Sequence, residues 1–143
     1  MKISIRNLKP EDLNKAAEIF YKSFNSVGQK WNQETTLKRL EQCINLESCW
    51  VAEADSKIVG FIISKIDNVL DHQELYIDLI AVEPKYHKLG IGKKLLETAE
   101  DYAKNHNLKA MWLSANSGLP SFNWYIKTGF KETKWKALTK ELK

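Results

Sequence analysis

The spacing of apolar and polar residues along the chain predicts short strands that alternate with amphipathic helices. Residues Ile3 to Arg6 alternate apolar and polar side chains, as a half-buried strand does. Pro10 fits the first turn of a helix, and apolar residues then recur at helical spacing from Leu13 to Phe24. Asn32 can cap a second helix. The apolar stripe expected for that helix comprises Leu37, Leu40 and Ile44.

The middle of the chain predicts a hairpin followed by a central strand. Trp50 to Glu53 and Lys57 to Ser64 have strand composition, and Asp55-Ser56 between them suits a tight turn. The stretch after Ile66 is polar, and we expect a loop there. Glu74 to Val82 is rich in apolar and β-branched residues, which is typical of a long, central strand.

The last third of the chain predicts a helix, a strand, a short helix and a further strand. Gly90 opens the first of these helices, and Lys109 to Ala115 is expected as a buried strand. Pro120 and Gly129 are placed to start and stop the short helix, and residues from Phe130 onward are expected to be strand. The resulting order β-α-α-β-β-β-α-β-α-β predicts an α/β fold with a mixed sheet.

Length and composition narrow the class of protein. A chain of 143 residues is expected to form a single domain spanning residues 1–143, and 43% hydrophobic and 28% charged residues are ordinary for a soluble protein. The net charge of +4 comes from lysines spread along the chain, so we do not expect nucleic-acid binding. No signal peptide, membrane-spanning run or metal-binding cysteine spacing is present, and Cys43 and Cys49 suit a cytoplasmic protein with reduced thiols.

Gly90 and Gly92 occupy a loop between the predicted central strand and the next helix. The first N–H groups of a helix lack internal partners and favour anions, and glycine lets a phosphate approach the backbone. Lys88, Lys93 and Lys94 add positive charge nearby. The pattern therefore indicates a phosphate site, best suited to a pyrophosphate.

The spacing of Gly90 and Gly92 does not match two other phosphate-binding loops. A Walker A loop needs four residues between its glycines and a Ser or Thr after its lysine, and neither condition is met. The dinucleotide fingerprint requires glycine where Leu95 stands. A plain turn whose glycines serve only for packing stays open on the glycines alone.

Two motifs together resemble a known family. The segment V-x-P-x-x-H-x-x-G-I-G-x-x-L-L after a strand resembles the acetyl-CoA-binding motif of the GNAT superfamily of N-acetyltransferases, written (Gln or Arg)-x-x-Gly-x-(Gly or Ala). Asn116 ends the next predicted strand, and WYIKTGF is similar to the Tyr-x-x-x-Gly-Phe of that family. The resemblance implies a single-domain GNAT-like fold, with a mixed, mostly antiparallel sheet of six or seven strands and about four helices. It also implies an enzyme that moves an acetyl group from acetyl-CoA to a primary amine by direct transfer in a ternary complex.

The resemblance assigns the coenzyme to particular positions. The loop amides would hold the pyrophosphate, the strand edge before the loop would pair with the pantetheine arm, and two asparagines would add side-chain contacts. His87 stands where the family usually has Gln or Arg, and it either donates to phosphate or is an exposed loop histidine. The implied cofactor-binding residues are Ile80, Ala81, Val82, His87, Lys88, Leu89, Gly90, Ile91, Gly92, Lys93, Asn116 and Asn123.

The resemblance also suggests catalytic residues. Tyr125 stands where the family often has a tyrosine that protonates the departing thiolate, although it could be only a core aromatic residue. Asp78 is our preferred base, and by strand alternation it shares a face with Glu74 and Tyr76. No metal is expected. Candidate acceptor contacts, each of which could instead be core or surface, are Phe24, Trp31, Glu34, Trp50 and Tyr76.

The acceptor and the assembly state are left open by the sequence. A small-molecule amine, a peptide N-terminus and a lysine side chain all fit. The final segment KETKWKALTKELK is short for the two closing strands of the family, and an open sheet edge there could pair with another subunit, so monomer and homodimer are both expected possibilities. A non-catalytic acyl-CoA-binding sensor or interaction module is the alternative function.

Overall fold

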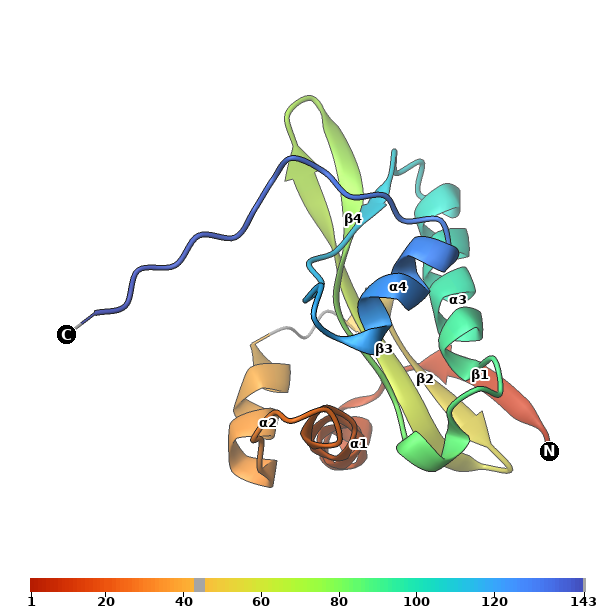
Figure 1. Ribbon diagram of the computed structural model, residues 1–143. Helices are drawn as coiled ribbons and strands as arrows, with labels where there is room; N and C mark the ends of the chain where they lie inside the picture. The colour runs from red at the N-terminus through yellow and green to blue at the C-terminus, as the bar shows by residue number, and fades with distance from the viewer. Residues whose placement is uncertain (43–45, 143) are drawn as a thin grey trace.

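The computed structural model describes residues 1–42 and 46–142, which form one sheet with helices on both faces (Figure 1). The sheet comprises β1 (Ile3–Asn7), β2 (Cys49–Ala54), β3 (Lys57–Val69), β4 (His72–Val82) and β5 (Met111–Trp112). The α-helices are α1 (Leu13–Asn25), α2 (Gln33–Glu41), α3 (Ile91–Asn105) and α4 (Pro120–Lys127). The strands stand in the order β1-β2-β3-β4-β5; neighbours are antiparallel except for β4 and β5, which are parallel.

Two apolar clusters lie on opposite faces of this sheet. On one face α3 contributes Ile91, Leu95 and Ala99 to a cluster that also includes Ile62 and Ile77 of the sheet, and residues of α4 pack beside it. On the other face the buried residues of α1 and α2 meet side chains such as Phe61 and Ala81. Figure 1 shows the same division, with α1 and α2 on one side and α3 and α4 on the other. The sheet is therefore the middle layer of three.

The predicted starts and stops of the helices are confirmed. Pro10 begins a short 3-10 turn that leads directly into α1. Asn32 caps α2, because its Oδ1 atom accepts a hydrogen bond of 2.9 Å from the amide of Thr35. Pro120 is the first residue of α4, and Gly129 follows that helix with φ +109°, a left-handed conformation that favours glycine. Ile44, expected on the stripe of α2, lies outside the described residues, as does Cys43.

The expected polar loop after Ile66 is wrong, because β3 continues to Val69. It forms a long hairpin with β4, in which Val69 pairs with His72 across the turn residues Leu70 and Asp71. This end of the hairpin is polar because it extends beyond the helices, so its side chains meet water rather than a core (Figure 1).

The strand content near the C-terminus is also smaller than expected. Residues 109–115 were predicted as a buried strand, but only Met111–Trp112 is strand, and Trp112 is exposed. Just before it, the Lys109 amide donates to the Gln73 carbonyl and the Ala110 carbonyl accepts from the Leu75 amide, each at 2.9 Å. The segment from Phe130 onward forms no strand within the described residues, so the sheet described has five strands rather than six or seven.

Candidate functional site

A bulge at Asp78 changes the direction in which the side chains of β4 point. The ladder pairs Ile63 with Leu79 and then Ser64 with Ile77, so Asp78 is an extra residue of β4. Before the bulge Ile77 packs on the α3 face, and after it Leu79 packs on the α1 face. The bulge therefore separates a regular strand end, residues 79–82, from the part of β4 that pairs with β5.

The edge of β4 after the bulge is open on the side away from β3. The amide of Glu83 donates to the carbonyl of Val59 at 2.7 Å, so alternation along an antiparallel ladder directs the peptide groups of Ala81 toward β3 and those of Ile80 and Val82 away from it. In the described residues β5 pairs only with Leu75 and Tyr76 and does not cover this edge. The N–H and C=O groups of Ile80 and Val82 therefore point away from β3, toward the open edge of β4.

The loop after β4 reaches α3 through a left-handed residue. Gly90 has φ +79°, and the amide of Lys94 is the first in the helix to bond back, donating to the Gly90 carbonyl at 3.1 Å. The preceding amides of Ile91, Gly92 and Lys93 are those that a helix leaves without an internal partner. These amides form the positive end of the α3 dipole, where the loop meets the helix.

Gly92 has a separate steric role. A Cβ atom at this position would lie 3.2 Å from Cζ2 of Trp124, so glycine allows α4 to pack closely on the start of α3. At Gly90 a Cβ would meet nothing within 4 Å, and only the backbone conformation requires glycine. The packing interpretation of these glycines is therefore correct for Gly92, and it coexists with the open amides of α3.

These elements enclose a cavity of about 550 Å³. It lies between the end of α1, the end of β4, the loop with the start of α3, and α4. Among the predicted site residues, the wall includes Phe24, Ile80, Ala81, Val82, His87, Lys88, Gly90, Ile91, Gly92, Lys93 and Tyr125. The wall residues that sequence reasoning missed are Ser23, Ser26, Val27, Tyr86, Leu119, Pro120, Ser121 and Trp124.

His87 makes a specific contact in the cavity wall. Its Nε2 atom lies 2.7 Å from the carbonyl oxygen of Val82. A carbonyl only accepts, so Nε2 carries the proton and donates, and Nδ1 is the remaining ring nitrogen. This hydrogen bond connects the loop to the end of β4. Because the Nε2 proton is donated to the Val82 carbonyl, it is not available for a hydrogen bond to a phosphate.

Tyr125 places a phenol in the same cavity from α4. Its ring packs against Trp124 and Phe130, with centroids 5.1 and 5.8 Å away. Burial raises the pKa of Tyr125 to about 12. The phenol is therefore neutral and able to donate a proton at neutral pH.

Asp78 faces α2 and is not part of the wall of this cavity. Its carboxylate is 12% exposed and forms a two-point ion pair with Arg39, at 2.7 Å from Nη2 and 3.4 Å from Nη1. Tyr76 contacts a different neighbour, since its ring lies 4.4 Å from that of Trp112. Glu74 accepts from His72 at 2.7 Å; this contact, followed by that with Asp71, raises the pKa of His72.

The remaining predicted residues are spread around the site. Trp31 packs edge-on against Phe20 at 4.8 Å and belongs to the α1 cluster, whereas Glu34 is 79% exposed and pairs with Lys38. Three further predicted residues are exposed and lie outside the cavity wall: Leu89, Asn116 and Asn123. Trp50 is buried, and it too lies outside the cavity wall. The Oδ1 atom of Asn116 accepts from the amide of Gly118 in its own turn, at 2.8 Å.

Two other features of the described residues bear on function. Among residues 1–42 and 46–142 no three His, Cys, Asp or Glu side chains are grouped so that they could hold a metal ion. In the same ranges no helix has both the length and the apolar character needed to cross a membrane.

Comparison with known proteins gives a consistent assignment of family. The model of the acetyltransferase (GNAT) family matches residues 11–130. A protein of Xenopus tropicalis named "Probable N-acetyltransferase camello" is 30% identical over 117 residues, which cover 80% of this chain and 53% of the relative. An N-alpha-acetyltransferase of Sulfurisphaera tokodaii is 35% identical over 95 residues, covering 59% of this chain and 57% of the relative. The chain thus spans little more than half the length of these two relatives.

The fold is also found among solved structures. A structure described as a predicted acetyltransferase with acetyl-CoA, from Clostridium acetobutylicum, aligns with a TM-score of 0.76. The alignment covers 96% of both chains at 19% sequence identity, which supports a common fold.

Proposed function

Because the chain belongs to the acetyltransferase (GNAT) family, we propose that it transfers an acetyl group from acetyl-CoA to a primary amine. The observation that carries this proposal is the cavity of about 550 Å³, which connects the start of α3, the open edge of β4 and the phenol of Tyr125. An anion site, a strand edge and a proton donor are the three things that an acyl thioester of coenzyme A requires at one site.

The start of α3 is the proposed site of the coenzyme pyrophosphate. The amides of Ile91, Gly92 and Lys93 converge there at the positive end of the helix, and Lys88 and Lys93 line the same cavity. Gly90 makes the left-handed turn that brings these amides to the cavity. Leu89, Asn116 and Asn123 are exposed, and we propose for them at most contacts at the outer end of the coenzyme.

The open edge of β4 is the proposed site of the pantetheine arm and the thioester. Peptide groups of Ile80 and Val82 point toward it, whereas those of Ala81 bond within the sheet. The Val82 carbonyl already accepts from His87, so the Val82 amide and both peptide groups of Ile80 are the groups offered to the arm. An amide of this pair can polarise the thioester carbonyl as an oxyanion hole does.

Tyr125 and Asp78 are proposed to handle the protons of the reaction. The amine nitrogen attacks the thioester carbon, the carbon–sulfur bond breaks, and the neutral phenol of Tyr125 gives its proton to the departing thiolate. The proton lost by the amine passes through water toward Asp78, whose carboxylate is held on the α2 side of the strand by Arg39. Holding the amine and the thioester in line for attack supplies much of the rate acceleration.

The acceptor is proposed to approach from the α1 and α2 side of β4. Phe24 of α1 lines the cavity, and Tyr76 lies two residues before the bulge at Asp78. Glu34 points into solvent and Trp31 packs against α1, so we assign both to structure rather than to acceptor binding. The acceptor is a primary amine, either of a small molecule or of a peptide.

Titration of the isotope-labelled protein with acetyl-CoA tests the site, with backbone amide resonances followed by NMR. The proposal predicts the largest changes at Ile80, Val82 and the amides of Ile91 to Lys93. Saturable changes confined to other parts of the chain would contradict it.

A non-catalytic acyl-CoA-binding module is the second candidate. The ion pair between Asp78 and Arg39 favours it, because it engages the carboxylate proposed as the base. Binding of acetyl-CoA at the predicted amides, with no acetylated product from any primary amine detected by mass spectrometry, would support this module over the enzyme.

A further inference from the structure

The last described residues, 131–142, carry large apolar side chains that are almost fully exposed. We call this segment the C-terminal arm. Trp135 and Leu138 are each 92% exposed and Leu142 is 85% exposed. The arm forms no helix or strand, and in Figure 1 it leads away from the body of the molecule. An exposed tryptophan with two leucines on a free segment is typical of a surface that packs against another protein chain.

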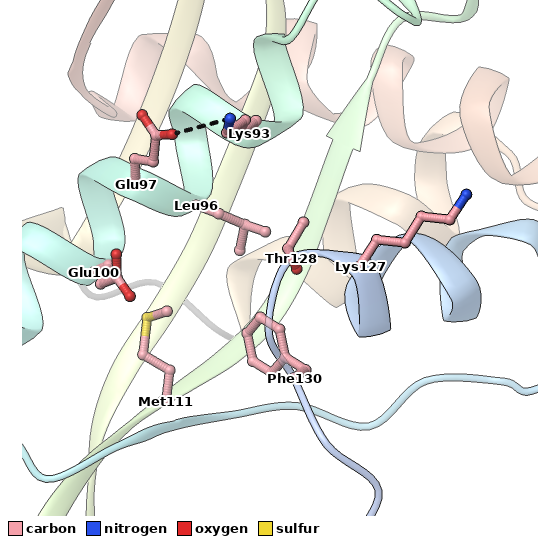
Figure 2. A pocket seen from close by; sticks show the side chains of 8 residues that line it. All are labelled: Lys93, Leu96, Glu97, Glu100, Met111, Lys127, Thr128 and Phe130. Atoms are coloured by element: carbon pink, nitrogen blue, oxygen red, sulfur yellow. Dashed lines mark ion pairs between the residues drawn. The ribbon is translucent and has the colours of Figure 1, made fainter.

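A second cavity, of about 360 Å³, lies between α3 and the end of α4, next to β5 (Figure 2). Leu96, Met111 and Phe130 supply apolar surface to it, and Figure 2 shows Glu97 and Glu100 along the α3 side. We call this cavity the α3–α4 pocket. Its full lining is Lys93, Leu96, Glu97, Glu100, Met111, Lys127, Thr128 and Phe130.

The strand beside this pocket ends the sheet that the structure describes. β5 contributes Met111 to the pocket and pairs with β4 on its other side. An edge strand presents unpaired N–H and C=O groups, which serve as a template for a further strand. The pocket and the edge together form a site for an extended segment with a large apolar side chain.

We propose that the C-terminal arm of one copy of this chain lies along β5 of a second copy and places Trp135 in the α3–α4 pocket of that copy. The arrangement is reciprocal, so two arms and two pockets form a closed dimer. The alternation Lys134-Trp135-Lys136-Ala137 is that of a strand with one apolar face. Residues 131–142 contain four lysines and two glutamates, a net charge of +2.

The chain connection favours a second copy over the same copy. Phe130 lines the pocket, so Trp135 of the same chain could enter it only if the backbone reversed within residues 131–134. Those residues are Lys-Glu-Thr-Lys, and the whole arm lacks Gly, Pro, Asn and Asp, the residues that tight turns prefer. An extended chain instead carries Trp135 roughly 16 Å beyond Phe130.

Molar mass in solution tests the dimer, measured by light scattering after size exclusion over a wide range of protein concentration. The 143-residue chain should reach twice its mass of 16.5 kDa. Trp135→Ala should raise the dimer dissociation constant by about tenfold or more, as truncation of a buried interface tryptophan does. The matched control is Leu70→Asn, which removes a side chain that is 98% exposed at the β3–β4 turn, where φ is +53° and asparagine is tolerated. This variant should dimerise like the wild type.

A mixing experiment distinguishes binding of the arm to the pocket of a second copy from dimerisation through another surface. The double variant Glu97→Lys and Glu100→Lys keeps its arm but changes the charged pocket lining from two lysines and two glutamates to four lysines, which repel an arm of net charge +2. Trp135→Ala keeps its pocket but lacks the tryptophan that fills it. Each alone should be mainly monomeric, and an equal mixture should regain dimers, because one intact arm then meets one intact pocket. A wild-type chain that stays monomeric, a dimer indifferent to Trp135→Ala, or a mixture no more dimeric than its components would overturn the proposal.

Discussion

Burial favours the neutral form of the Tyr125 phenol, which an ordinary tyrosine also has at neutral pH. Burial raises its pKa to about 12, and the ring is held between Trp124 and Phe130. A tyrosine in this state keeps its proton at neutral pH and can donate a hydrogen bond to the departing sulfur. A thiolate, whose conjugate thiol has a pKa of about 8.5, is a weaker base than this phenolate, so the proton transfer is uphill and the phenolate must regain a proton afterwards, for example the one lost by the acylated amine. The residue is therefore suited to be a general acid at neutral pH.

Tyr125→Phe should lower kcat by roughly 10²- to 10⁴-fold, since it removes the donor but keeps the ring. Binding of acetyl-CoA, measured by calorimetry, should change little, because the packing of α4 is retained. Tyr102→Phe is the control, as Tyr102 is on α3 and packs against Trp50 away from the cavity. A Tyr125→Phe enzyme with wild-type kcat would remove Tyr125 from the mechanism.

His87 is expected to act through the loop rather than through the phosphate. His87→Ala removes the bond to the Val82 carbonyl and should weaken acetyl-CoA binding by roughly fivefold, the equivalent of one ordinary hydrogen bond. His87→Gln can still donate and should recover most of that loss. Calorimetric titration measures both variants. A wild-type affinity that falls steadily as pH rises through the imidazole range would instead indicate a charged contact from His87 to phosphate.

At the scale of elements, Asp12 joins the end of β1 to the start of α1. Its buried carboxylate accepts from Nη1 and Nη2 of Arg6 at 2.8 and 3.0 Å and from the amide of Lys9 at 2.8 Å. The hydrogen bonds from Arg6 are the main cause of a pKa below the ordinary 3.8, against the opposing effect of burial. The folded state therefore favours the ionised form of Asp12.

Asp12→Asn should lower the free energy of unfolding by about 1–3 kcal/mol at neutral pH. Because the folded pKa is depressed, the wild-type contribution is complete above pH 3.8 and is lost as the pH falls through the folded value. The difference between wild type and variant should therefore shrink in acid, as measured by urea unfolding at several pH values. Glu11→Gln is the exposed control. A difference that is constant with pH would contradict this assignment.

The two loop glycines should respond differently to alanine. Gly92→Ala places a Cβ about 3.2 Å from Trp124 and should cost roughly 1–3 kcal/mol through overpacking between α3 and α4. Gly90→Ala meets no atom within 4 Å and should cost about 1–2 kcal/mol from its left-handed backbone. Gly90→Asn should recover part of the second loss, whereas Gly92→Asn should recover none. Urea unfolding measures all four, and equal recovery at both sites would contradict the distinction.

At the scale of the whole molecule, the sequence predicted the elements whose pattern is local. The apolar spacing from Leu13 to Phe24 and the turn at Asp55-Ser56 were sufficient to predict α1 and the β2–β3 hairpin, and both are confirmed. The bulge at Asp78 was not predictable, because Leu79 to Val82 is apolar without a break and hides the change of face.

In the candidate site, too, the features with a local sequence pattern were predicted and those that depend on the fold were not. The two glycines and three nearby lysines, set between a strand and a helix, are local features, so the sequence alone was sufficient to propose the start of α3 as an anion site. The walls contributed by Ser23 to Val27 and by Leu119 to Trp124 come from distant helices with no distinctive motif of their own. Only the fold brings them to β4, which is why sequence reasoning missed most of them.

The central claim is that the chain transfers an acetyl group from acetyl-CoA to an amine, and thiol release during incubation with a panel of amines tests it most directly. The panel should contain small polyamines, peptides with a free N-terminus and lysine peptides. We predict that at least one amine raises thiol release well above the rate with acetyl-CoA alone, and that Tyr125→Phe abolishes most of this increase. Binding of acetyl-CoA without amine-dependent thiol release anywhere in the panel would contradict the account.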